Sequence, residues 1–138
     1  MRVHDKEATS LHIPLVAMLR WCLKPEVIFR HCPNGEHRDP RTAAKLKAMG
    51  VLPGSPDLEF FWKHYWEDLE GSHTCLRVLF LELKLPRGRM SPSQQLFAER
   101  VGAVGAEHIM VTSIDAAIAA LGVRGLIKPS VEVCGRRW

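Results

Sequence analysis

An apolar segment near the middle of the chain ends in two charged residues of opposite sign. It runs Leu76-Arg77-Val78-Leu79-Phe80-Leu81-Glu82-Leu83-Lys84, and this density of apolar residues predicts a buried strand. Because side chains alternate along a strand, Glu82 and Lys84 are expected on one face and the leucines on the other. Burying charges costs free energy unless a metal, a substrate or water meets them. The strand end is therefore a candidate functional site.

Asp57 provides a second acidic side chain, directly after Pro56 and 25 positions before Glu82. Two carboxylates beside Lys84 would suit a hard divalent cation and a phosphodiester. The alternative is a solvated sheet edge, where a Glu-x-Lys pair discourages strand pairing. The spacing alone leaves both interpretations open.

Length and composition are those of one soluble globular domain. The chain has 138 residues, 46% hydrophobic and 25% charged, which is ordinary for such proteins. A net charge of +4 and a pI near 9.1 permit a polyanionic partner without requiring one. The four cysteines match no zinc spacing, so we expect reduced thiols in a cytoplasmic protein. No segment looks like a signal peptide or a membrane span, so we expect no membrane partner.

The first half of the chain predicts two helices and two strands. A helix is expected from about Asp5 to Leu23, with a kink or a later start at Pro14. A short strand covers 27–29. A helix capped by Asp39 begins at Pro40 and ends at Gly50. A strand follows over 57–62, and 63–74 is predicted to be a long polar-aromatic connection.

The second half predicts the strand over 76–84 and two further helices around one more strand. Ser91 caps the first helix, and Gln94 is placed to close a capping box. Its predicted buried stripe is Leu96, Phe97, Val101 and Val104. A strand over 108–112 leads to a helix capped by Ser113, which runs through Leu121 and stops at Gly122. The order α-β-α-β-β-α-β-α predicts an α/β fold with a mixed sheet flanked by helices.

Five aromatic side chains cluster between positions 60 and 66. We expect packing in the core or at a subunit interface, with stacking on nucleic-acid bases as the alternative. The cluster comprises Phe60, Phe61, Trp62, Tyr65 and Trp66.

Several short strings resemble, in the same order, the VRR-NUC domain, the virus-type replication-repair nuclease. They are His31-Cys32-Pro33-Asn34-Gly35-Glu36, Ala44-Lys45-Leu46-Lys47-Ala48-Met49-Gly50-Val51, Gly54-Ser55-Pro56-Asp57-Leu58, Leu81-Glu82-Leu83-Lys84 and Gly88-Arg89-Met90-Ser91-Pro92-Ser93-Gln94. The resemblance covers about Glu7 to Leu121, the expected core of a single nuclease domain, and leaves 122–138 as a tail without clear signals. It implies a restriction-endonuclease-like fold of the PD-(D/E)XK superfamily. It also implies a bacterial or phage-encoded DNA endonuclease that uses Mg²⁺ or Mn²⁺, forms a homodimer and prefers branched DNA in replication, recombination or repair.

The resemblance also assigns roles to individual residues. Asp57 and Glu82 would hold the metal together with the backbone carbonyl of Leu83. Lys84 would touch the attacking water and the scissile phosphate. Gln94 matches a glutamine on the following helix, and Glu7 matches an acidic residue on the first helix. The glutamine expected shortly after that acid is missing, and His12 is the nearest polar residue.

Polar and basic residues outside this set are candidates for contact with nucleic acid. His31 and Asn34 would lie in a loop, where they would orient the site or a phosphate, or simply form a turn. The remaining four candidates would contact the DNA backbone or form solvated faces: Arg41, Lys47, Arg87 and Arg89. Two other functions stay open, a nucleic-acid-binding module without turnover and a phosphodiesterase acting on small nucleotides.

Overall fold

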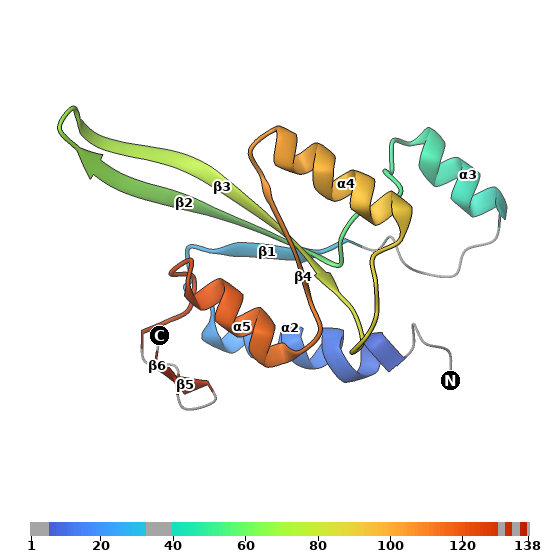
Figure 1. Cartoon of the computed structure of the whole chain (residues 1–138), viewed down its shortest axis with the longest axis horizontal. Helices are drawn as coiled ribbons and strands as arrows, with labels where there is room; N and C mark the ends of the chain where they lie inside the picture. Colours follow the sequence, from blue (N-terminus) through green and yellow to red (C-terminus); the bar gives the residue numbers. More distant parts are fainter. Residues whose placement is uncertain (1–5, 33–39, 130–131, 134–135, 138) are drawn as a thin grey trace.

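A four-stranded mixed sheet forms the centre of the molecule (Figure 1). The computed structural model describes residues 6–32, 40–129, 132–133 and 136–137. The strands lie in the order β1-β2-β3-β4, with β1–β2 and β2–β3 antiparallel and β3–β4 parallel. Their bounds are β1 Ile28–His31, β2 Leu58–Asp68, β3 Gly71–Leu83 and β4 Glu107–Val111.

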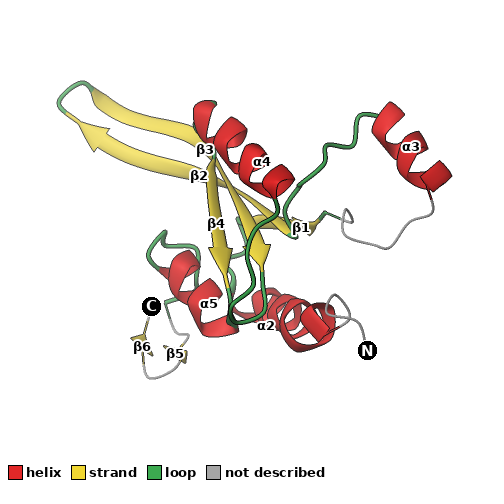
Figure 2. Ribbon diagram, turned by 45° about the vertical axis from the view of Figure 1, so that its right-hand side comes forward, coloured by secondary structure: helices red, strands yellow, loops and turns green. Residues whose placement is uncertain are grey.

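Helices cover both faces of the sheet, as the sequence predicted (Figure 2). The helices α2 (Ile13–Cys22) and α5 (Ile114–Gly122) lie on one face, and α4 (Pro92–Ala103) lies on the other. The helix α3 (Pro40–Ala48) stands clear of the sheet and has no buried residue. A second, two-stranded antiparallel sheet pairs β5 (Glu132–Val133) with β6 (Arg136–Arg137). No helix in the described part of the chain is long and apolar enough to cross a membrane.

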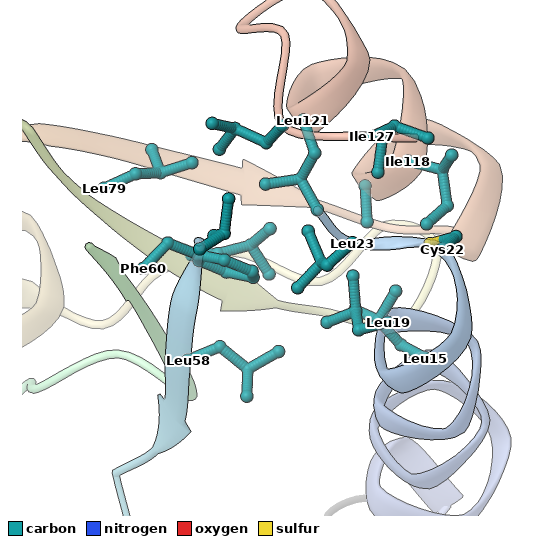
Figure 3. Packing of buried hydrophobic residues seen from close by; sticks show 14 of the residues in the cluster. Leu15, Leu19, Cys22, Leu23, Leu58, Phe60, Leu79, Ile118, Leu121 and Ile127 are labelled. Atoms are coloured by element: carbon teal, nitrogen blue, oxygen red, sulfur yellow. The ribbon is translucent and has the colours of Figure 1, made fainter. Parts of the chain in front are cut away.

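The hydrophobic core lies between the sheet and the pair α2 and α5 (Figure 3). The predicted alternation along β3 is confirmed, because Leu79, Leu81 and Leu83 are all at most 1% exposed. The core also continues beyond α5, where Leu126 and Ile127 are buried and Ile127 bridges to Leu23.

Pro14 is accommodated by a change of helix type. A π-helical turn, η1 (Ala8–His12), precedes α2, and Pro14 falls in the first turn of α2. Proline lacks a backbone N–H, and the first turn of a helix is the place where that donor has no intrahelical partner. The predicted later start at Pro14 therefore corresponds to the beginning of α2.

The connection predicted over 63–74 is wrong. The pairing of β2 with β3 continues without a break from Leu58 opposite Leu81 to Asp68 opposite Gly71. Residues 63–76 therefore form a two-stranded arm that projects beyond the sheet (Figure 1). The prediction failed because a strand with one buried face alternates buried and exposed residues, whereas twelve of these fourteen residues are exposed.

The buried stripe predicted on α4 is also wrong. Only Phe97 is buried, against the ring of Phe80 at a centroid distance of 5.2 Å. Leu96 is 55% exposed and Val104 is 83% exposed. Helical spacing predicts which residues share a face, but it does not say whether another element covers that face. The two predicted caps, Ser91 and Ser113, are confirmed, while Gly122 is the last residue of α5 rather than its stop.

Candidate active site

Asp57 and Glu82 lie side by side where β2 begins and β3 ends. The register pairs Leu58 with Leu81, and one further step along it brings Asp57 opposite Glu82. Directly opposed residues of an antiparallel pair lie on the same face with their Cβ atoms about 5 Å apart. Asp57 is also held to the neighbouring strand, because its Oδ2 accepts a hydrogen bond of 2.7 Å from the backbone N–H of Leu83.

Glu82 is a buried carboxylate with one oxygen left without a partner. Its residue exposure is 2%. Its Oε1 accepts hydrogen bonds from Lys84 Nζ at 2.7 Å and from Gln94 Nε2. Its Oε2 is buried and has no hydrogen-bond partner among the described residues. Burial raises the pKa of Glu82 to about 7, and the negative charge of Asp57 adds to that rise.

Lys84 lies between two carboxylates. Its Nζ is 2.7 Å from Glu82 Oε1 and 3.9 Å from Glu7 Oε1. Glu7 in turn accepts a hydrogen bond of 3.2 Å from the backbone N–H of Leu85 through Oε2. Burial lowers the pKa of Lys84, but the hydrogen bond to Glu82 and the surrounding acidic charges outweigh it, so the net shift is upward. Glu7 therefore joins the first helix to the end of β3.

Gln94 caps α4, as the sequence predicted, and also contacts Glu82. Its backbone N–H bonds to Ser91 Oγ and its Oε1 accepts from the Ser91 N–H, which completes the capping box of α4. Its Nε2 remains available and donates to Glu82. One side chain thus connects the start of α4 to the buried carboxylate.

These residues line one open cavity of about 580 Å³. The sequence-predicted residues on its wall are Glu7, Asp57, Glu82, Lys84, Arg89 and Gln94. Gly54 brings the preceding loop against α4, since a Cβ there would lie 2.2 Å from the backbone oxygen of Ser93. Cys32 also lines the cavity, where burial and then a hydrogen bond with Glu59 raise the pKa of its thiol to about 12. That thiol stays protonated at neutral pH.

Two histidines lie beside Asp57, His12 from η1 and His31 from the end of β1. His12 Nδ1 lies 4.0 Å from Asp57 Oδ1, and its ring makes an edge contact with His31 at 4.6 Å between centroids. His31 Nδ1 is 2.9 Å from the backbone oxygen of Asp57. A carbonyl only accepts, so Nδ1 of His31 is the protonated nitrogen. The sequence named His12 as the polar residue nearest to the missing glutamine, and the structure places it beside Asp57.

Some predicted residues do not join this cavity. Arg41 and Lys47 lie on α3, and neither they nor Arg87 is part of the cavity wall. Asn34 lies outside the described residues. Contact of these residues with nucleic acid stays a prediction.

The side chains around the cavity meet only some of the requirements for binding a hard divalent cation. Within the described ranges, no three or more His, Cys, Asp or Glu side chains form a group that could hold a metal ion. Two carboxylates do face the same cavity, and Glu82 offers a buried oxygen without a partner. Mg²⁺ is bound by one or two carboxylates and keeps several waters. Asp57 and Glu82 therefore fit such an ion, with Leu83 as the predicted backbone donor.

Comparison with known proteins adds no support for any family. No protein-family model, no curated protein and no solved structure matches this chain. The resemblance to the VRR-NUC domain therefore rests on the strings quoted above.

Proposed function

We propose that this protein is a metal-dependent nuclease that hydrolyses DNA phosphodiester bonds. The observation that supports it best is Glu82, a buried carboxylate with an unpartnered oxygen in an open cavity that also contains Asp57 and Lys84. This arrangement does not stabilise the fold, because an unpartnered buried carboxylate oxygen costs free energy. A ligand that supplies positive charge would remove the cost.

Asp57, Glu82 and the carbonyl of Leu83 would hold Mg²⁺ or Mn²⁺. When bound, the cation would supply positive charge against the phosphate and lower the pKa of water. Asp57 is already held in position, since the Leu83 N–H and the two histidines contact its carboxylate and its backbone.

Lys84 would act as a donor toward the phosphate or the attacking water. Its raised pKa keeps the ammonium charged at neutral pH in the metal-free site. A charged lysine donates hydrogen bonds and cannot accept a proton, so this protonation state favours electrostatic stabilisation over general-base catalysis. Gln94 would position Glu82, and Glu7 would position Lys84.

DNA is the proposed substrate because basic residues follow the catalytic strand. Arg89 lines the cavity, and Arg87 lies in the turn before it. A chain with one such site would cut both strands of a duplex or a junction most simply as a symmetric dimer. Membership in the VRR-NUC family, the PD-(D/E)XK fold and a cytoplasmic role in replication, recombination or repair belong to the same proposal.

A second candidate is a nucleic-acid-binding module of the same fold without turnover. Its support is that Glu82 Oε1 is already occupied by Lys84 and Gln94, and that the described residues contain no three-side-chain metal group. In that case Lys84 would be a structural partner of Glu82.

A panel of branched, flapped and linear DNA, incubated with Mg²⁺, Mn²⁺ or EDTA, separates the two candidates. If the protein is a nuclease, DNA cleavage products are expected with either metal and none with EDTA. Lys84→Ala should then lose cleavage and keep DNA binding. Binding without cutting under every condition would support the module, and turnover of small nucleotide diesters alone would support the phosphodiesterase.

A further inference from the structure

A second cavity lies beside the candidate active site. Its volume is about 470 Å³, which is within the range of cavities that bind small organic groups. Cys32 and Ser55 line both this second cavity and the one that contains Asp57 and Glu82. The two spaces are therefore neighbours, and a ligand bound in one can extend into the other.

The walls of the second cavity are largely apolar. The strand β3 contributes Phe80, and α4 contributes Phe97 and Val101. The rings of Phe80 and Phe97 meet edge to face at 5.2 Å between centroids, so they form a packed floor. The loop before β2 adds Val51 and Leu52. Such a lining suits a flat, mostly apolar group better than it suits a phosphate or a sugar.

One ion pair supplies the charged groups of the second cavity. Arg30 on β1 and Glu59 on β2 lie directly opposite each other, and Arg30 Nε donates to Glu59 Oε2 at 2.6 Å. This bond uses one of the five N–H donors of a guanidinium. The Glu59 side chain is 12% exposed, whereas the Arg30 side chain is 68% exposed. A hydrogen-bond acceptor and a donor are thus held side by side at the wall of an apolar space.

The strand register relates this ion pair to the carboxylates of the candidate active site. Asp57 and Glu59 are two residues apart, so they share a face of the sheet at a separation of roughly 7 Å. Phe80 lies opposite Glu59, and one repeat further along the same strands Glu82 lies opposite Asp57. That separation is close to the span between the phosphate and the base of a single nucleotide. A nucleotide with its phosphate at Asp57 and Glu82 can therefore place its base against Glu59.

We propose that the second cavity binds one unpaired nucleobase of the substrate strand. The inference rests on the proposed function, because the phosphate of the same nucleotide would lie at Asp57 and Glu82. A base in a duplex must leave its stack to enter such a cavity, and the cost is least for a base that is already unpaired. The preferred DNA therefore has an unpaired nucleotide at the scissile phosphate, as in a gap, a bulge or the base of a flap.

Glu59 also determines which bases bind best. A carboxylate only accepts hydrogen bonds, so it favours bases that present an amino group. Adenine, cytosine and guanine each carry one, with a ring nitrogen beside it that can accept from Arg30. Thymine instead carries an N–H between two carbonyl oxygens, which the carboxylate repels. The three amino-bearing bases are therefore expected to bind more tightly than thymine.

Fluorescence anisotropy with hairpin DNA, in EDTA, tests this inference on the full chain. Three hairpins share one backbone and carry cytosine, thymine or an abasic residue at a single unpaired position. The wild type is expected to bind the cytosine hairpin about tenfold more tightly than the thymine hairpin, and more tightly still than the abasic one. These ratios do not depend on hydrolysis, because EDTA removes the metal.

Two matched variants test the role of Glu59. Glu59→Met keeps the length of the side chain and removes both acceptor oxygens, so it should abolish the preference for cytosine over thymine. Glu107→Met is the control and should keep that preference. Glu107 also forms an ion pair between neighbouring strands, with Arg77 at 3.2 Å, and it lies opposite Leu79 on the core face of the sheet.

A cavity-filling variant covers the case in which Glu59→Met fails to fold by circular dichroism. Val101→Phe extends from α4 into the second cavity and leaves the ion pair in place. It should weaken binding of the cytosine hairpin to the level of the abasic hairpin.

Three outcomes would overturn the base site. One is equal affinity of the wild type for all three hairpins. Another is a Glu59→Met protein that binds every hairpin more weakly by the same factor, which would make the ion pair purely structural. The third is displacement of the cytosine hairpin by an equal concentration of deoxycytidine monophosphate, which would assign the second cavity to small nucleotides.

Failure of the proposed function gives a different result. A chain that discriminates between the hairpins and never cleaves DNA with Mg²⁺ or Mn²⁺ would keep the base site and lose the nuclease. A chain that cleaves with these metals and binds all three hairpins equally would keep the nuclease and lose the base site.

Discussion

Gln94 joins the N-terminus of α4 to the buried carboxylate of Glu82. Its Oε1 accepts from the Ser91 N–H at 2.8 Å, while its Nε2 donates to Glu82 Oε1. The cap and the site thus depend on opposite ends of one amide. Their contributions can be separated, because each end can be changed without the other.

Gln94→Glu should keep the cap and damage the site. A glutamate at this position still accepts from the Ser91 N–H and suits a helix N-terminus, but it places a like charge beside Glu82. We expect cleavage to fall about 100-fold while the melting temperature changes little. Ser91→Ala is the control, with a stability loss of about 1 kcal/mol and unchanged turnover per folded molecule. Equal losses of turnover in both variants would mean that Gln94 acts only as a cap.

Stability should depend on pH through Glu82. The pKa of Glu82 is about 7 in the folded chain, above the ordinary value of 4.5. The folded state therefore holds a proton that the unfolded state has released, and stability falls as pH rises from about 4.5 to 7. We expect a loss on the order of 3 kcal/mol in EDTA. Urea unfolding should show this slope in the wild type and not in Glu82→Gln.

Measuring the same unfolding stability in the presence of divalent cations is a second test of Glu82. A cation bound by the ionised carboxylates stabilises the folded state, so at pH 7 and above Mg²⁺ should restore most of the stability that the wild type loses between pH 4.5 and 7. It should have little effect on Glu82→Gln. An equal pH slope in both proteins would show that Glu82 titrates normally and would remove the argument for a cation there.

Arg87 occupies a backbone position that favours glycine. Its φ is +69°, and no other described residue apart from glycines has a positive φ. It follows Pro86 in a turn closed by the Gly88 N–H and the Leu85 carbonyl at 2.7 Å, which is the third position of a type II turn. Arg87→Gly should therefore stabilise the protein by about 0.5 to 1 kcal/mol.

The same variant tests contact with DNA. If Arg87 touches a phosphate, Arg87→Gly weakens DNA binding and reduces the salt slope by about 1, although the fold becomes more stable. Arg89→Gly is the control for backbone strain, since it should lose binding and gain no stability. Unchanged DNA affinity in Arg87→Gly would remove Arg87 from the interface.

Alanine substitutions at Gly54 and Gly50 can be compared to test how the loop before Asp57 packs. Both have positive φ, +79° and +90°. An alanine Cβ at position 54 would meet the backbone of Ser93 and Gln94 within 2.6 Å, whereas position 50 has nothing within 4 Å. Gly50→Ala should cost about 1 to 2 kcal/mol and keep activity. Gly54→Ala should cost more and reduce cleavage by displacing α4. Similar melting temperatures and activities for the two variants would contradict this packing.

The sequence predicted those parts of the site that depend on local rules. Strand alternation separated Glu82 and Lys84 from the leucines, and the capping box located Gln94 at the start of α4. These features depend on residues close in sequence, so periodicity and hydrogen-bond chemistry were sufficient.

What the sequence missed depends on contacts between distant segments. The arm was missed because neither of its faces is buried in this chain. The stripe on α4 was assigned to the core because spacing cannot tell whether a partner covers it. His12 in η1 lies beside Asp57 at the beginning of β2, far from it in the sequence, and no local pattern encodes that contact.

Single-turnover cleavage of DNA by Asp57→Asn, with and without Mg²⁺, tests the central claim most directly. Asp57→Asn keeps an oxygen for the Leu83 N–H and removes the charge that would hold the cation. Asp115→Asn, an exposed site in the first turn of α5, is the matched control. The proposal predicts Mg²⁺-dependent cleavage by the wild type and the control, and a loss of about 1,000-fold in Asp57→Asn. Cleavage by Asp57→Asn at the wild-type rate, or cleavage by the wild type in EDTA, would contradict it.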